Sequence, residues 1–255
     1  VRVGMLLCAP AGGDLLFDES LPEQGRNFTT KIWNAFRLVS NWKVADLEQP
    51  LHSKLALEWF EQYLNKCKET LNTQFEQYRI SEALMTVYTG FRDEISSWLL
   101  EIIKPGFEQP IDRISYDKPI YLFEEMLQLL HPFMPFITEE IWQALPHEGE
   151  FLMLSKWPEY NEKFSFPAEE EAMQTVIEAI TAIRARRNEM NVAPSKKVHY
   201  TVATAHADTF SAGIPFFTRL ASASDVTIVP ADAAIDADGK AVSYTHLRAH
   251  ETELH

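Results

Sequence analysis

One amphipathic stretch carries the side chains best suited to binding a nucleic acid. In residues 26–39, RNFTTKIWNAFRLV, a helix turning about 100° per residue gathers apolar side chains on one face. That face consists of Phe28, Ile32, Ala35, Phe36 and Val39, and the opposite stripe of Arg26, Thr30, Asn34, Arg37 and Asn41. Arg and Asn donate hydrogen bonds to phosphates and base edges. The pattern predicts a helix that packs through one face and binds through the other, unless it is an ordinary bundle helix with a basic surface.

Positive charge is concentrated in two short segments of an acidic chain. The 255 residues carry a formal net charge of -14, which argues against binding nucleic acid through overall charge. In residues 22–44, a single Glu23 stands against Arg26, Lys31, Arg37 and Lys43. In residues 184–197, a single Glu189 stands against Arg184, Arg186, Arg187, Lys196 and Lys197. Any nucleic-acid contact must therefore be local, although solvation and helix capping also explain such runs.

No other pattern indicates a catalytic or metal centre. Cys8 and Cys67 lie far apart without a partner His or thiol at metal spacing, which disfavours a disulfide or zinc site. His131, Glu139 and Glu140 are interpreted as structural, because adjacent helical carboxylates point about 100° apart and do not clamp one ion. The sequence shows no Ser-His-Asp spacing, phosphate loop or His-Glu-x-x-His string. We therefore predict no catalytic residue, metal or cofactor in this chain.

The elements that must position the basic stretch are helices, which the sequence predicts throughout residues 22–145. Apolar residues recur at helical spacing over 51–79. A further helix starts at Ile80 with Ser81 as its predicted N-cap, and Pro105-Gly106 ends it.

The last predicted helix of this series, residues 117–145, contains two prolines. Pro132 and Pro135 lack the backbone N–H, so the helix should break between His131 and Phe136. Thr138 marks the predicted restart.

The remaining chain reads as a connector followed by a small α/β unit. An amphipathic helix is predicted over 168–189, a strand over 198–204, a helix over 208–222 and a strand over 225–229. The predicted fold class is mainly α, a helical bundle followed by this unit. The predicted organisation is the end of a preceding domain at 1–21, the bundle at 22–146, a connector at 147–167, the α/β appendage at 168–230, disorder over 231–255 and a foreign tail over 243–255.

Three segments resemble one family. The basic stretch is similar to the opening helix of the anticodon-binding domain in valyl-tRNA synthetases, through Arg26, Asn27, Phe28, Lys31, Ile32, Trp33, Asn34, Ala35 and Arg37. Thr29 and Thr30 depart from a common Cys-Asn pair. The string LHPFMPFITEEIW resembles a segment shared by valine, isoleucine, leucine and methionine synthetases. The third match consists of Arg187, Glu189, Met190, Asn191, Pro194, Ser195, Lys196 and Lys197.

The resemblance implies an enzyme activity of which this chain would supply only one part. A parent enzyme would use ATP and Mg²⁺ to attach valine to tRNA, and would hydrolyse mischarged threonine in a separate editing domain. The family's His-x-Gly-His and Lys-Met-Ser-Lys-Ser strings for handling ATP are absent here, so this chain is expected to be inactive alone. Asp14, Phe17 and Asp18 resemble the junction that follows the family's catalytic domain, so we expect a piece of a longer chain.

The expected role of this chain is tRNA placement. The partner would be tRNA(Val), bound by a cytoplasmic monomer with no membrane or DNA contact. The first group of predicted tRNA-binding residues is Arg26, Asn27, Lys31, Asn34 and Arg37, and the weaker second group is Arg184, Arg186, Arg187, Lys196 and Lys197. The alternatives are an isoleucine, leucine or methionine ligase fragment, and a helical protein-interaction scaffold without an RNA role.

Overall fold

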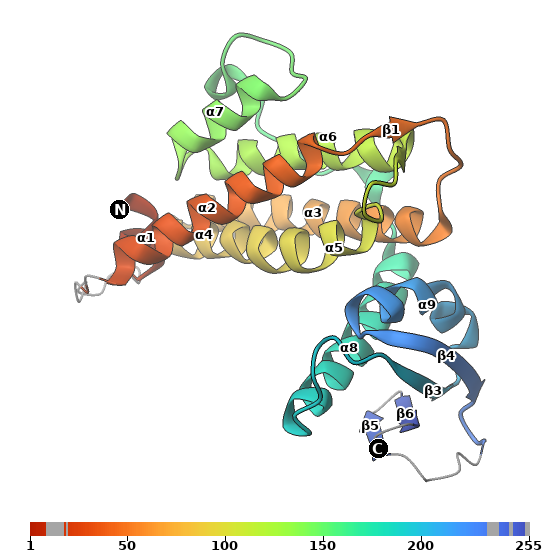
Figure 1. The fold of residues 1–255 in the computed structure, drawn as a ribbon. Helices are drawn as coiled ribbons and strands as arrows, with labels where there is room; N and C mark the ends of the chain where they lie inside the picture. The colour runs from red at the N-terminus through yellow and green to blue at the C-terminus, as the bar shows by residue number, and fades with distance from the viewer. Residues whose placement is uncertain (9–17, 19, 234–239, 245–246, 253–255) are drawn as a thin grey trace. The chain divides into compact units, whose positions relative to one another are not determined.

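The chain divides into two compact units. The computed structural model describes residues 1–8, 18, 20–233, 240–244 and 247–252, the last two ranges by backbone only. The first unit comprises residues 1–49 and 60–166, and the second comprises 50–59 and 167–255 (Figure 1). The predicted motif residues Asp14 and Phe17 lie outside the described part of the chain.

The first unit is a helical bundle with one short strand pair. Strands β1 (Val44–Ala45) and β2 (Ile111–Asp112), which the sequence did not predict, pair in parallel. The helices are α1 (Arg2–Leu7), α2 (Ser20–Ser40), α3 (Leu51–Glu76, which begins in the second unit), α4 (Ile80–Thr89), the π-helix η1 (Gly90–Leu99), α5 (Leu100–Ile103), α6 (Arg113–Leu130), α7 (Pro135–Ala144) and the 3₁₀ turns η2 (Leu152–Leu154) and η3 (Glu162–Phe164).

Aromatic side chains from three helices form the centre of this bundle. The ring centroid of Phe91 in η1 lies 5.9 Å from that of Phe28 in α2 and 5.4 Å from that of Phe123 in α6. All three side chains are buried, as are Leu64 of α3 and Leu127 of α6. Burying each such side chain contributes about 1.5–3 kcal/mol, so this apolar centre holds α2 in place.

The structure confirms the predicted helix break after His131. Helix α6 ends at Leu130 and α7 begins at Pro135, three residues before the predicted restart at Thr138. Proline is tolerated at the first position of a helix because its missing N–H would be unbonded there anyway. The N-cap position of α4 is likewise Arg79 and not Ser81.

The second unit contains the predicted strand-helix-strand. Helix α8 (Pro167–Glu189) is followed by β3 (Val198–Thr204), α9 (Ala207–Leu220) and β4 (Ala223–Pro230), and the two strands pair in parallel. A Cβ atom at Gly213 would lie 3.1 Å from Val176 Cγ2, so glycine lets α9 approach α8 closely. Phe210 and Phe217 of α9 are fully buried beneath the strands.

The expectation of disorder after residue 230 differs from the structure in two segments. Strands β5 (Lys240–Tyr244) and β6 (Leu247–Thr252) extend the sheet to the order β4-β3-β6-β5, and β6 pairs antiparallel with β3. Strand β3 therefore has a neighbour on both edges, which satisfies both rows of its backbone hydrogen-bonding groups. That residues 243–255 are foreign to the protein stays a prediction.

The mainly α fold class with a small α/β unit is confirmed. Among the described residues, no helix is long and apolar enough to cross a membrane.

Candidate nucleic-acid interface

Helix α2 buries the apolar face that the sequence predicts. Phe28 and Val39 are 2% exposed and Ile32 is fully buried. The Phe28 ring centroid lies 4.5 Å from that of Tyr88 in α4. The polar residues left in solvent on the other face include Arg26, Asn27, Thr30, Asn34 and Arg37. A regular helix thus separates the packing residues from the potential binding residues.

The two arginines of this face are held only weakly. Arg26 Nη2 lies 2.9 Å from Glu23 Oε1, and both side chains remain more than half exposed. Exposed pairs of this kind contribute about 0–1 kcal/mol, so Arg26 can exchange Glu23 for another anion. Arg37 forms no ion pair among the described side chains. Both guanidinium groups are available to a phosphate or a base edge.

Lys31 occupies a different environment from its neighbours on α2. Its Nζ donates a hydrogen bond of 2.8 Å to the backbone oxygen of Arg92 in η1, and its side chain is half-buried. Burial lowers the pKa of Lys31, which Asp93 partly offsets and Arg92 reinforces. Of the first predicted group, Lys31 alone is directed to the protein, and it ties α2 to η1.

The π-helical turn that accepts Lys31 was not predicted. A Cβ at Gly90 would lie 3.1 Å from the Tyr63 hydroxyl, so glycine admits the tyrosine at the start of η1. The Ser97 hydroxyl donates to the same Arg92 oxygen at 3.1 Å. Gly90 interrupting a helical pattern was the available signal, because such a glycine often has a packing reason. The wide turn brings a backbone acceptor to the edge of α2.

An exposed arginine of η1 extends the polar surface beside Lys31. Arg92 donates two hydrogen bonds to Asp93, at 2.8 and 2.7 Å, and its guanidinium lies 5.1 Å from the centroid of Tyr88. The pKa of Arg92 is raised, chiefly by its hydrogen bond to Asp93. The sequence reasoning missed Arg92, because adjacent Arg and Asp residues carry no local excess of charge.

A largely apolar groove adjoins the start of the exposed stripe. Its volume is about 550 Å³, and Arg26 and Thr29 of α2 line it together with residues 1–3 and 133–137. Phe136 in this lining is 88% exposed. An exposed ring next to a weakly held guanidinium is the combination on which unpaired bases stack.

The side chains of the second basic segment lie in different environments. Arg184 is exposed, and its Nε donates to the Leu220 oxygen at 2.6 Å. Arg186 Nη1 lies 3.0 Å from Glu189 Oε2. Its position in the last turn of α8 is also one where the helix dipole favours a cation. Lys196 and Lys197 are exposed in the loop that follows α8.

Arg187 differs from the expectation that it contacts RNA, because its side chain is inside the second unit. It is 6% exposed, and its Nη1 donates to the Tyr200 hydroxyl at 3.0 Å. Its Nη2 donates to the oxygens of Ala193 and Lys196 at 3.1 and 2.7 Å. A buried guanidinium requires such acceptors, since desolvating an unpaired charge is very costly. The position of Arg187 is therefore structural.

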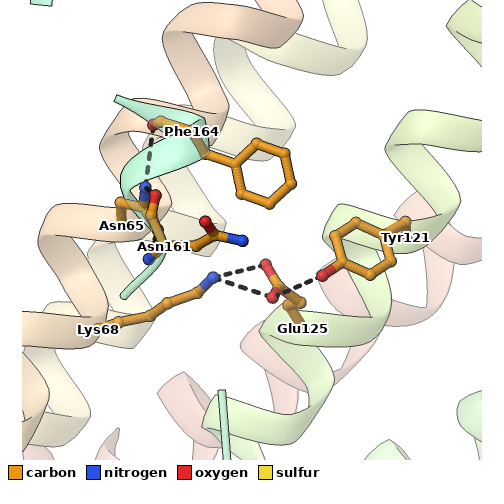
Figure 2. A network of polar contacts seen from close by, with 6 residues as sticks. All are labelled: Asn65, Lys68, Tyr121, Glu125, Asn161 and Phe164. Atoms are coloured by element: carbon orange, nitrogen blue, oxygen red, sulfur yellow. Dashed lines mark hydrogen bonds and ion pairs between the residues drawn. The ribbon is translucent and has the colours of Figure 1, made fainter. Parts of the chain in front are cut away.

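A second buried cation lies on α3, in the first unit. Lys68 is 2% exposed and its Nζ lies 2.9 Å from Glu125, which also accepts from Tyr121 (Figure 2). One turn earlier, the Asn65 amide donates to the oxygens of Asn161 and Phe164 at 2.8 and 2.9 Å. These polar contacts fasten α6 and the connector to α3, and Lys68 is buried away from solvent.

The remaining ionisable candidates have structural partners. His131 Nδ1 lies 2.8 Å from Thr138 Oγ1, and burial lowers the pKa of His131. Glu139 accepts from the backbone N–H of Leu152 at 3.0 Å. In the part of the chain that the structure describes, no three His, Cys, Asp or Glu side chains converge as metal ligands.

Comparison with known proteins assigns this arrangement to a family. The sequence profile described as the anticodon-binding domain of tRNA ligase matches residues 58–202. Valine--tRNA ligase of Parabacteroides distasonis is 45% identical over 229 residues, covering 89% of this chain and 26% of that protein. Valine--tRNA ligase of Phocaeicola vulgatus is 47% identical over 232 residues, covering 90% of this chain and 26% of that protein.

More distant relatives carry the same description. Valine--tRNA ligase of Staphylococcus carnosus is 34% identical over 205 residues, covering 77% of this chain and 23% of that protein. The chain spans about a quarter of the length of the curated relatives it matches. The profile covers more than half of the chain, and the relatives carry the resemblance into the segments on either side. The chain belongs to the anticodon-binding domain family of tRNA ligases.

Proposed function

We propose that this chain is the tRNA-binding part of a valine–tRNA ligase and that the exposed stripe of α2 contacts the anticodon stem-loop of tRNA(Val). The parent enzyme attaches valine to this tRNA with ATP and Mg²⁺, and removes mischarged threonine. Those reactions require groups outside this chain, which is inactive alone. The parent works in the cytoplasm, as a monomer.

One observation carries the proposal. Helix α2 directs Arg26, Asn27, Asn34 and Arg37 into solvent, while Phe28, Ile32, Ala35 and Val39 are buried on its opposite face. Sites on rigid helices hold their donors in place, and these donors match phosphate oxygens and base edges. The relatives of this chain named above are valine ligases, which supports tRNA(Val) as the partner in this proposal and not the tRNAs of the isoleucine, leucine and methionine enzymes.

A binding titration with matched variants tests the proposal. The chain is titrated with tRNA(Val) and with tRNA(Ile) at two salt concentrations. The test variant is Arg26→Ala with Arg37→Ala. The control variant is Arg79→Ala with Arg113→Ala, which removes the same charge from two exposed, carboxylate-paired arginines on α4 and α6.

The proposal predicts a selective loss in the first variant. Replacing the two α2 arginines should weaken tRNA(Val) binding at least about tenfold, because each phosphate or base contact of an arginine is worth about 1–3 kcal/mol. The control variant should change binding by less than about threefold. Equal losses in both variants would show that only net charge matters. Equal affinity for both tRNAs would remove the valine assignment, and no binding at all would favour the protein-interaction scaffold.

A further inference from the structure

We propose that Arg187 is a positioning residue that holds residues 193–197 so that Lys196 and Lys197 bind phosphates of the RNA backbone. The inference rests on the proposed function and assigns a second RNA contact to the second unit. It separates two roles within the basic segment: a buried guanidinium shapes the loop, and two exposed ammonium groups bind.

The loop begins where α8 ends in a left-handed residue. Asn191 has a φ of 54°, and the N–H of Val192 donates to the Arg187 oxygen at 2.9 Å. This is the hydrogen-bond pattern of a Schellman helix end, in which asparagine is the usual substitute for glycine. The chain reverses there and passes back along the last turn of α8.

A tight turn follows directly. The N–H of Lys196 donates to the Ala193 oxygen at 3.0 Å, which closes a four-residue turn with Pro194 in its second position. Proline is favoured there because its fixed φ matches the turn. Strand β3 starts two residues later, so the turn lies between two regular elements.

Two side chains bind the carbonyl oxygens of this turn from its inner side. Arg187 Nη2 bonds both the first oxygen, of Ala193, and the last, of Lys196. The Ser222 hydroxyl donates to the Pro194 oxygen at 2.9 Å. The Tyr200 hydroxyl, which accepts from Arg187, donates to the Ala221 oxygen at 2.9 Å and thereby orients the guanidinium.

The carbonyl oxygens of this turn, which carry partial negative charge, therefore point towards the interior of the second unit. Ser195, Lys196 and Lys197 are exposed on the outer side, and neither lysine forms an ion pair with any side chain that the structure describes. The carboxylate of Glu189 is already occupied by Arg186. An outer surface with ammonium groups and few competing acceptors attracts a phosphate, in a chain that otherwise repels one.

Arg187 cannot be the phosphate ligand itself. Its terminal nitrogens already have three acceptors and the residue is 6% exposed. Its planar fork reaches all three acceptors at once, which the compact ammonium of a lysine does not. Arg187→Lys therefore keeps the net charge of the protein but loses some of the hydrogen bonds that hold the turn.

A double-mutant cycle tests this assignment in the full 255-residue chain with tRNA(Val). The variants are Arg187→Lys, the pair Lys196→Ala with Lys197→Ala, and all three together. The slope of log affinity against log salt concentration falls by about 0.7 for each single-strand phosphate that the protein no longer neutralises, so the lysine pair should reduce it by about 1.4. Arg187→Lys should reduce affinity and slope in the same direction.

The combination decides whether Arg187 acts through the lysines. If it does, Arg187→Lys has no further effect on affinity or slope once both lysines are alanine. If the two effects simply add, the positioning role is wrong. If the lysine pair leaves the slope unchanged, the assignment of phosphate binding to the lysines is wrong.

Two further variants separate loss of folding, tested by Ile180→Val, from loss of positioning, tested by Ser222→Ala. Ile180→Val creates a small cavity in α8, at a fully buried residue away from the loop, and should leave the slope unchanged. Ser222→Ala frees only the Pro194 oxygen at a half-buried site and should reduce the slope slightly. An effect of Ile180→Val as large as that of Arg187→Lys would overturn the inference.

The outcome is distinguishable from failure of the proposed function. Wild-type binding to tRNA(Val) that depends on Arg26 and Arg37 but not on Lys196 and Lys197 rejects only the second contact. Absence of wild-type binding rejects both.

Discussion

The two basic segments of this chain have similar composition and opposite architecture. In α2, Arg26 and Arg37 lie along one side of a regular helix and remain in solvent. At the end of α8 the last of three arginines, Arg187, turns into the unit and bonds a hydroxyl and two carbonyl oxygens. A local excess of positive charge therefore indicates where an anion could bind, and it does not identify which cation binds it.

The difference follows from what surrounds each segment. Arg26 on α2 pairs with Glu23 of the same helix, whereas the half-buried Lys31 reaches a backbone oxygen of η1. The end of α8 is followed at once by a reversing loop whose carbonyl oxygens need donors. Carbonyl groups that leave bulk solvent are almost always hydrogen-bonded, and Arg187 is one of the donors that the fold supplies here.

The largest expected effect is on the free energy of unfolding, which should distinguish the two basic segments. Arg187→Ala should lower the free energy of unfolding by about 3 kcal/mol, because it removes a buried side chain and leaves the Tyr200 hydroxyl and the Lys196 oxygen without the hydrogen bonds that Arg187 donates. Arg37→Ala, at an exposed position, should change it by less than about 0.5 kcal/mol. Urea unfolding gives the values, and amide hydrogen exchange in β3 shows whether the loss lies in the second unit. Equal losses in both variants would abolish the distinction.

An intermediate effect is expected for Lys31, which shares features of both segments. Lys31→Met should change stability by no more than about 1 kcal/mol at neutral pH, because it removes a partly exposed hydrogen bond together with its desolvation cost. It should weaken tRNA(Val) binding less than Arg37→Ala does. Binding losses of the same size would place Lys31 on the RNA and not on η1.

The pH dependence of stability provides a second measurement on Lys31. Burial lowers the pKa of Lys31 below its ordinary 10.5, so the unfolded chain binds this proton more tightly than the folded protein. The stability of the wild type should therefore rise with pH, relative to Lys31→Met, as the pH climbs from the lowered value towards 10.5. A difference of the opposite sign would contradict the burial of this ammonium group.

The smallest expected effect concerns the weak ion pair on α2. Glu23→Gln should change stability by less than about 0.5 kcal/mol, since the Arg26–Glu23 pair is exposed. It should strengthen tRNA(Val) binding about twofold, because it removes a competitor for Arg26. Glu82→Gln, which releases Arg79 on α4 in the same way, is the control and should leave binding unchanged.

Much of the fold was predictable from local patterns. Apolar spacing located α2, α3 and α8, and the prolines after His131 located the break between α6 and α7. The alternation in residues 198–204 located β3, and the following elements completed the strand-helix-strand. Each of these features depends on residues within one or two turns of one another, so periodicity and backbone chemistry determine them.

The features that sequence reasoning missed depend on distant partners. At the start of the π-helix η1, Tyr63 lies close to Gly90, and a hydrogen bond from Asn65 to Asn161 fastens the connector to α3. Even the burial of Arg187 requires Tyr200, thirteen residues further along the chain. Helical capping explained a cation at that position equally well, so nothing local distinguished an inward from an outward side chain.

The sequence by itself determined the helical class, the helix break, the two basic segments and the family, because these depend on periodicity, on the missing N–H of proline and on motifs read in order. The tertiary structure alone decided which of ten predicted tRNA-binding residues face solvent. Whether such a side chain is buried or exposed depends on the hydrogen-bond acceptors that the folded chain places around it, since a buried charge is tolerated only where acceptors surround it.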